Sequence, residues 1–250
     1  MSVTTGAGGV SLPSPPSPAL TGQTIGSQRK DRPSSPMIAI IDYGIGNLRS
    51  VQRALERAGA EAVITGDPMQ IRLADGVVLP GVGAFGEGMA QLEERGLVLA
   101  IYQIIAVGRP FLGICLGMQL LFQESEEMGH FDGLGVFGGR VRRFADSGPA
   151  SDDPPGSAVR NKVPQVGWNQ LHIERENPLL ADVPDGSFAY FVHSYYCEPT
   201  RPDTIVATTD YGVAYASVVA KGSVFGVQFH PEKSQLVGAA LLRNFVLLTL

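Results

Sequence analysis

Cysteine is scarce in this chain of 250 residues, which has only Cys115 and Cys197. A disulfide-stapled secreted domain is normally much shorter and carries more cysteines, so that class is excluded and a reducing, cytoplasmic setting is expected. Basic residues are also few, since 19 of them face 24 acidic ones and give a formal net charge of −5. A nucleic-acid partner is not expected, because there is no basic surplus to bind a phosphate backbone.

Long apolar runs are absent as well. A helix that crosses a bilayer needs about 20 consecutive apolar residues, and the apolar stretch at 241–250 is interrupted by Arg243 and Asn244. We therefore expect no membrane association. Hydrophobic residues still make up 44% of the chain, which is enough for a substantial core and excludes disorder over the full length.

Aromatic residues are missing from residues 1–36, which consist mainly of Gly, Pro, Ser and Thr. Such a segment buries too little apolar surface to offset the entropy of ordering, so we expect a disordered tail. A secretory signal is not expected, because no apolar segment follows a basic start. A transit peptide stays open, since the segment is Ser-rich and acid-poor but lacks early arginines. Residues 37–250 are expected to form one domain.

The first half of this domain alternates short apolar, β-branched runs with helical periodicity. Strands are expected at 37–41, 62–64, 76–79 and 111–114, with helices at 48–58, 97–107 and 118–122. A buried helix is expected at 97–107, because that stretch is almost wholly apolar. This alternation predicts an α/β fold with a doubly wound, mostly parallel central sheet and helices on both faces.

The second half has strand patterns with little helix between them. Strands are expected at 136–144, 166–173, 188–196, 213–220 and 224–229, and a helix at 235–248. The strands are predicted to form antiparallel additions to the sheet. A solvated loop is expected at 145–157, which is rich in Asp, Pro and Gly.

A cysteine lies on a predicted strand-to-helix turn. The string Gly113-Ile114-Cys115-Leu116-Gly117 follows a buried strand and precedes a helical run. Small residues two before and two after the cysteine permit the sharp turn of a nucleophile elbow, and a helix N-terminus favours the thiolate. Cys115 is therefore a candidate nucleophile, although it could also be a small buried residue at a strand end.

His230 and Glu232 follow another predicted strand and are separated by Pro231. Residues two apart in an extended segment point to the same side. A cysteine that attacks a carbonyl carbon needs a base to accept and return its proton, and the base needs a carboxylate to fix its tautomer. Cys115, His230 and Glu232 thus form a candidate triad, although a surface His beside an acid is common.

A glycine-rich turn, Pro80-Gly81-Val82-Gly83, ends the third predicted strand. The N–H groups of Val82, Gly83 and Leu116 are candidates for an oxyanion hole, because the C-terminal ends of parallel strands share one edge. Residues 81–86 also match G-x-G-x-x-G, a dinucleotide-binding string. That string normally follows the first strand, and no acid stands about 20 residues later to bind a ribose. We prefer the oxyanion hole and expect no cofactor and no metal.

Together these strings resemble the class I glutamine amidotransferase family, and the resemblance covers essentially all of residues 37–250. Within the family the chain is most similar to the glutaminase subunits of imidazole glycerol phosphate synthase. The supporting strings are DYGIGNL at 42–48, LPGVGAF at 79–85, GICLGMQLL at 113–121, KVPQVGWN at 162–169 and HPEKS at 230–234. The Pro-x-x-Gly-Trp-Asn string is the one that separates these subunits from other amidotransferases.

The resemblance implies a reaction in two steps. Cys115 attacks the side-chain amide of glutamine to give a γ-glutamyl thioester, and His230 protonates the departing ammonia. Water then releases glutamate. The residues implied to bind glutamine are Gln119, Glu127, Ser194 and Tyr195, with help from the backbone of His193. Taken alone, Gln119 could be a solvated helix residue, Glu127 part of an acidic run and Tyr195 a strand aromatic.

The resemblance also implies a partner. Related glutaminases pass ammonia to a (β/α)₈-barrel synthase subunit, and the chain after His230 is too short for a barrel of about 250 residues, so we expect a heterodimer. Asn47, Trp168 and Lys233 match positions that face this partner, although Trp168 could instead pack in the core. Gln165 stands where the family often has His, which could alter coupling between the two chains.

Three other interpretations stay open. A glutaminase of another amidotransferase would have the same triad without the Gly167-Trp168-Asn169 string. A catalytically inactive regulatory subunit would lack the nucleophile or the base, and neither is missing. A nucleotide-binding oxidoreductase is supported only by the glycine-rich turn.

Overall fold

A computed structural model describes residues 35–145 and 162–250 of the chain. The expected tail at 1–36, apart from its last two residues, lies outside the described residues. The expected loop at 145–157 lies outside them too, apart from Ala145. No helix among the described residues is long and apolar enough to cross a membrane.

A parallel arrangement of five strands forms one half of the central sheet. Its strands, in spatial order, are β2 (Glu61–Thr65), β1 (Met37–Ile41), β3 (Gly76–Gly81), β4 (Phe111–Cys115) and β14 (Val224–Val227). The expected doubly wound core is confirmed, but β14 pairs in parallel with β4 and is not one of the antiparallel additions. The C-terminal ends of these strands therefore meet at one edge, where β4 ends in Cys115.

The other half of the sheet is mostly antiparallel. It continues through β13 (Ala214–Lys221), β11 (Tyr195–Pro199), β7 (Phe137–Arg143), β5 (Phe122–Ser125) and β6 (Phe131–Asp132), while β12 (Ile205–Asp210) joins β13 to β9 (His172–Ile173). One pair in this half, β5 and β7, is parallel. The remaining strands, β8 (Gln165–Gln170) and β10 (Phe188–His193), form a separate antiparallel pair. The expected strands at 166–173 and 188–196 are thus each divided in two.

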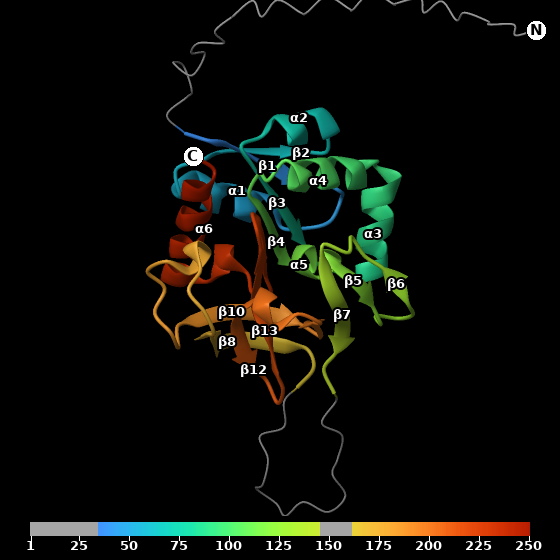
Figure 1. The fold of residues 1–250 in the computed structure, drawn as a ribbon, viewed down its shortest axis with the longest axis vertical. Coiled ribbons are helices and arrows are strands. Elements are labelled where there is room, and N and C mark those ends of the chain that lie inside the picture. The colour runs from blue at the N-terminus through green and yellow to red at the C-terminus, as the bar shows by residue number, and fades with distance from the viewer. Residues whose placement is uncertain (1–34, 146–161) are drawn as a thin grey trace, which may run out of the picture. The chain divides into compact units, whose positions relative to one another are not determined.

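Helices cover both faces of the sheet, as Figure 1 shows. On one face α1 (Leu48–Arg57) packs beside α6 (Gln235–Leu248), and on the other lie α2 (Pro68–Leu73), α3 (Phe85–Glu94) and α4 (Leu97–Ala106). Strand β1 serves both cores, because Ile38 and Ile40 point to the first face and Ala39 and Ile41 to the second. The 3₁₀ turns are η1 (Pro178–Leu180), η2 (Pro202–Thr204) and η3 (Pro231–Lys233).

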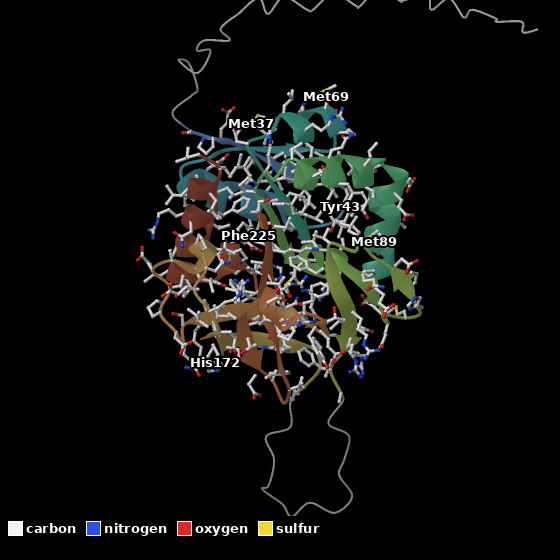
Figure 2. The ribbon with its side chains drawn as sticks, in the orientation of Figure 1. Met37, Tyr43, Met69, Met89, His172 and Phe225 are labelled. Atoms are coloured by element: carbon white, nitrogen blue, oxygen red, sulfur yellow. The ribbon has the colours of Figure 1, made fainter. Side chains whose placement is uncertain are left out.

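Several helices differ from expectation. Helix α4 is only half-buried, because Leu99 and Tyr102 face solvent. The helical run expected at 118–122 is the shorter α5 (Leu116–Leu120), after which Phe122 begins β5. Helices α2 and α3 were not expected at all. In Figure 2 Tyr43 and Phe225 lie in the interior, whereas Met69 and His172 lie at the surface.

Candidate active site

The backbone of Cys115 turns sharply between β4 and α5. Its φ is 54° and its ψ is −110°, a conformation that side-chain-bearing residues rarely adopt and that costs about 1–3 kcal/mol. A Cβ atom at Gly113 would lie 2.6 Å from the carbonyl oxygen of Gly117, and one at Gly117 would overlap the carbonyl oxygen of Leu79. The two small residues are therefore required for the elbow, as the sequence predicts.

His230 and Glu232 form a buried pair beyond the end of β14. Nδ1 of His230 donates a hydrogen bond to Oε1 of Glu232 over 2.9 Å, and the two side chains are only 3% and 1% exposed. The main chain of His230 is held on both sides, since its N–H donates to the carbonyl of Tyr190 and its carbonyl accepts from Ser234 Oγ. The ring orientation is therefore fixed by several elements.

The electrostatics of His230 depend on its two neighbours. Burial lowers the pKa of the ring, but the nearby Cys115 thiol and the hydrogen-bonded carboxylate of Glu232 outweigh it and raise that pKa to about 9. Nε2, the nitrogen that Glu232 does not occupy, is buried and lacks a hydrogen-bond partner among the described residues. The imidazolium form of the ring is therefore favoured at neutral pH, and Nε2 is the nitrogen that can exchange a proton with the thiol.

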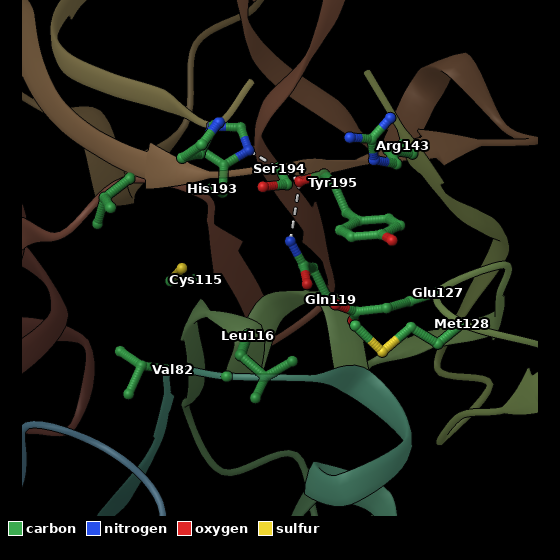
Figure 3. A pocket seen from close by; sticks show the side chains of 13 residues that line it. Val82, Cys115, Leu116, Gln119, Glu127, Met128, Arg143, His193, Ser194 and Tyr195 are labelled. Carbon is green, nitrogen blue, oxygen red and sulfur yellow. Dashed lines mark hydrogen bonds between the residues drawn. The ribbon is translucent and has the colours of Figure 1, made fainter. Parts of the chain in front are cut away.

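A cavity of about 490 Å³ lies at the thiol. Its wall contains the expected nucleophile, oxyanion and substrate residues Val82, Gly83, Cys115, Leu116, Gln119, Glu127, Ser194 and Tyr195. In Figure 3 Cys115, Val82 and Leu116 line one side and His193, Ser194 and Tyr195 the opposite side, with Gln119 between them. The structure thus brings together segments of β3, β4, β5 and β10–β11 that are far apart in sequence.

Gln119 is buried and uses both hydrogens of its amide nitrogen within the protein. Nε2 donates to the carbonyl of Tyr195 over 3.0 Å and to Oε1 of Gln228 over 3.1 Å. Its own carbonyl oxygen remains for other contacts. The alternative of a solvated helix residue is therefore wrong.

Glu127 follows β5 in the chain, and its side chain contacts the N-terminus of α3. Its Oε2 accepts a hydrogen bond of 2.7 Å from the N–H of Phe85, and burial raises the pKa of this carboxyl group despite that bond. The carboxylate thus occupies the helix end on which a dinucleotide pyrophosphate would have to lie. This contact argues against the oxidoreductase interpretation.

Two further polar residues near the thiol were not singled out from the sequence. Nε2 of Gln228 donates to Sγ of Cys115 over 3.7 Å, and His193, expected to help only through its backbone, lines the cavity with its ring. The string that precedes His230 contains Gln228, but a lone polar residue at a strand end gives no signal of its contacts. Among the described residues no group of three or more His, Cys, Asp or Glu side chains could hold a metal ion.

The expected partner-facing residues lie at the surface. Trp168 is 46% exposed, so the alternative of core packing is wrong, and Asn47 and Lys233 are exposed as well. Tyr190 links two of them, because its ring lies 5.9 Å from that of Trp168 and 5.7 Å from Nζ of Lys233. Trp168, Tyr190 and Lys233 thus form one surface cluster beside η3.

The fold and the cavity define a class of protein. The family model of class-I glutamine amidotransferases matches residues 39–248, and the chain belongs to this family. It is 50% identical over 213 residues to the imidazole glycerol phosphate synthase subunit HisH of Geobacter metallireducens, covering 84% of this chain and 97% of that protein. The HisH subunit of Geobacter sulfurreducens is 51% identical over 208 residues, with 83% and 97% covered. Within the family, the chain therefore belongs to the HisH subunits of imidazole glycerol phosphate synthase.

Solved structures of lower identity share the fold. PurLQS from Thermotoga maritima superimposes with a TM-score of 0.63 at 19% identity, covering 86% of this chain and 97% of that one. The glutaminase domain of CTPS from Trypanosoma brucei gives 0.57 at 17% identity, covering 86% and 94%. At such identities the likeness concerns the fold alone.

Proposed function

We propose that this chain hydrolyses glutamine to glutamate and ammonia with Cys115 as nucleophile, His230 as proton carrier and Glu232 as its orienting carboxylate. The observation that carries the proposal is the buried His230–Glu232 hydrogen bond of 2.9 Å, together with the effect of Cys115, on its strained turn, on the pKa of the His230 ring. Family membership supplies the reaction class, and this geometry supports the choice of residues.

The proton moves between two groups. Transfer of the Cys115 proton to Nε2 of His230 gives the imidazolium that the raised pKa of the ring favours, and the thiolate so formed attacks the amide carbon of glutamine. When the C–N bond breaks, the imidazolium returns the proton to nitrogen, ammonia leaves and a γ-glutamyl thioester remains. Water, deprotonated by the same ring, then cleaves the thioester to glutamate. A ring with a pKa of about 9 is protonated at neutral pH, and this proton is the one that the departing ammonia needs.

Each tetrahedral intermediate carries a negative oxygen. We assign its stabilisation to the N–H groups of Leu116 and of Val82 or Gly83, because all three residues line the cavity at Cys115. The close packing at Gly81 supports this assignment, since a Cβ there would overlap the hydroxyl of Tyr43 and lie 2.9 Å from Cβ of Leu116. The two backbone segments are thereby held against each other, as an oxyanion hole demands.

Glutamine binding is assigned to Gln119, Glu127, Ser194 and Tyr195. With both of its N–H groups used internally, Gln119 offers a carbonyl oxygen, which suits an amide or ammonium donor of the substrate. Glu127 adds an anionic group on the same wall. Both are therefore matched to the donor groups of glutamine.

We further propose that the ammonia is taken up by a partner, a (β/α)₈-barrel synthase. The exposed cluster of Trp168, Tyr190 and Lys233 supports this, because aromatic and cationic side chains are favoured anchors at interfaces. Asn47, at the start of α1, is assigned to the same interface. Both cysteines of the chain are free thiols, which supports a cytoplasmic location.

The test is Cys115→Ala in the full chain, assayed for glutamate release with the barrel partner present. We expect glutamate release to fall by about 10⁴-fold or more, because triad members act as a unit. Cys197→Ala is the matched control, since burial raises the pKa of that thiol well above its usual range and keeps it unreactive. Release by the Cys115 variant at the parental rate would overturn the nucleophile assignment.

A further inference from the structure

Gln228 lies next to the candidate nucleophile because of strand register. Val227 of β14 pairs with Ile114 of β4, so the next residue of each strand, Gln228 and Cys115, lie side by side. The side chain of Gln228 is fully buried, and its backbone N–H donates a hydrogen bond to the carbonyl of Ser217 on β13. A buried side-chain amide such as that of Gln228 destabilises the folded state unless each of its polar atoms has a hydrogen-bond partner.

The carbonyl of Tyr195 determines which way two amide groups point. A carbonyl oxygen only accepts, so the atom of Gln119 that lies 3.0 Å from it is Nε2. The same Nε2 lies 3.1 Å from Gln228, whose facing atom is therefore the acceptor Oε1. The other end of the Gln228 amide is then Nε2, which lies 3.7 Å from Sγ of Cys115. An N–H group thus faces the sulfur.

His193 holds this carbonyl from the other side. Nδ1 lies 2.8 Å from the Tyr195 oxygen, and Nε2 lies 3.3 Å from the hydroxyl of Tyr215. Burial lowers the pKa of His193 to about 4, so at pH 7 the ring has one proton, which resides on Nδ1 where the carbonyl can accept it. The Tyr215 hydroxyl donates its single hydrogen to Oε1 of Gln165 on β8 over 2.9 Å, so it does not also donate to Nε2 of His193. The buried hydrogen bonds that reach the sulfur therefore run from His193 through the Tyr195 carbonyl, Gln119 and Gln228.

We infer that Gln228 is a positioning residue whose Nε2–H group holds the Cys115 sulfur in the orientation for attack, with the Tyr195–Gln119 hydrogen bonds keeping that N–H turned toward it. The inference rests on the proposed role of Cys115 as nucleophile. A donor to a thiolate makes a charge-assisted hydrogen bond, which is stronger than one to a neutral thiol. Gln228 therefore stabilises the form of Cys115 that attacks glutamine.

Two variants of Gln228 test the donor nitrogen and the acceptor oxygen of its side chain separately. Gln228→Glu keeps an oxygen to accept from Gln119 but replaces the donor that faces the sulfur. We expect its kcat to fall about 10- to 100-fold while its KM for glutamine stays within about threefold. Gln228→Met has a similar length and neither polar atom, so kcat should fall and KM should rise as Gln119 loses its acceptor.

Alkylation of Cys115 by iodoacetamide provides a readout that needs no turnover. In the full chain at pH 7, with the modified peptide identified by mass spectrometry, both variants should react about 10-fold more slowly than the parent. Ser217→Ala is the matched control, because its buried hydroxyl lies on the neighbouring strand and has no hydrogen-bond partner among the described residues. It should leave both measurements unchanged.

Two outcomes are decisive. If either Gln228 variant folds, as judged by circular dichroism, and keeps kcat and alkylation rate within twofold of the parent, the positioning role is overturned. If instead Cys115→Ala retains glutaminase activity in the same assay, the nucleophile assignment fails, and the two failures are thereby distinguished.

Discussion

At Cys115 the requirements of chemistry and of chain geometry act on the same residue. The positive φ of 54° lifts the side chain out of the strand direction and into the cavity. The strain of about 1–3 kcal/mol is tolerated because β4 is buried in the centre of the sheet and α5 follows directly. Glycine at 113 and 117 removes the atoms that would prevent the turn. The elbow is thus a local property that sequence spacing can report.

Glu232→Gln tests how far the carboxylate controls His230. The amide keeps an oxygen for Nδ1 but removes the negative charge, so the pKa of His230 should fall below its value of about 9. We expect kcat to fall about 10²- to 10⁴-fold with little change in KM, because the imidazolium loses its stabilising partner. Steady-state glutaminase assays give kcat, and an NMR titration of the ring gives the pKa.

The control for this variant is Glu126→Gln, which removes an exposed carboxylate. Among the described residues, this carboxylate forms ion pairs only with arginines of β7. Its effect on kcat should be negligible. Normal turnover by Glu232→Gln, together with an unshifted His230 titration, would refute the orienting role of the carboxylate.

At the scale of elements, Glu127 connects β5 to α3. Helix α3 begins after Ala84, which provides no side-chain cap, and the N–H of Phe85 depends on Glu127 instead. Glu127→Ala leaves that buried donor without its acceptor, so the free energy of unfolding should fall by about 1–3 kcal/mol. Urea denaturation at pH 7 measures the loss. Glu127→Gln retains an acceptor oxygen and should recover most of it; equal losses in the two variants would contradict this account.

Element by element, the parallel core was the part most accessible from sequence. β1, β4, α1 and α6 have continuous apolar runs or clear helical spacing, and their predicted bounds are confirmed to within a few residues. Helix α3 was missed because Gly86 and Gly88 weaken the helical pattern. Both glycines are closely packed, since a Cβ at Gly86 would lie 2.7 Å from the ring of Phe131 and one at Gly88 would lie 3.2 Å from the side chain of Leu120. Local propensity was overridden there by tertiary contact.

For the site, short-range spacing was informative and long-range register was not. Cys115, and the His230–Glu232 pair, are recognisable because each motif is contiguous in the chain. Gln228 was missed because its contact with Cys115 depends on how β14 pairs with β4, 113 residues apart. The direction of that pairing, parallel where an antiparallel addition was expected, follows from the whole sheet and from no local string.

At the scale of the whole molecule, two buried histidines make stability depend on pH in opposite ways. Burial lowers the pKa of His193 to about 4, whereas Cys115 and Glu232 raise that of His230 to about 9 despite its burial. Both return to about 6.5 when the chain unfolds. Below pH 6.5 the unfolded chain binds the extra proton at His193, and above it the folded chain holds the extra proton at His230.

The free energy of unfolding should therefore be greatest near pH 6.5. It should decrease as pH falls from about 6.5 to 4, because His193 must stay neutral in the folded state, and decrease as pH rises from about 6.5 to 9, because His230 loses its stabilising proton. Each arm amounts to about 3 kcal/mol. Urea denaturation across this range measures the curve. His193→Asn should remove the decrease in unfolding free energy on the acid side alone, and His230→Asn should remove the decrease on the alkaline side alone. Decreases that persist in these variants would assign the pH dependence to other groups.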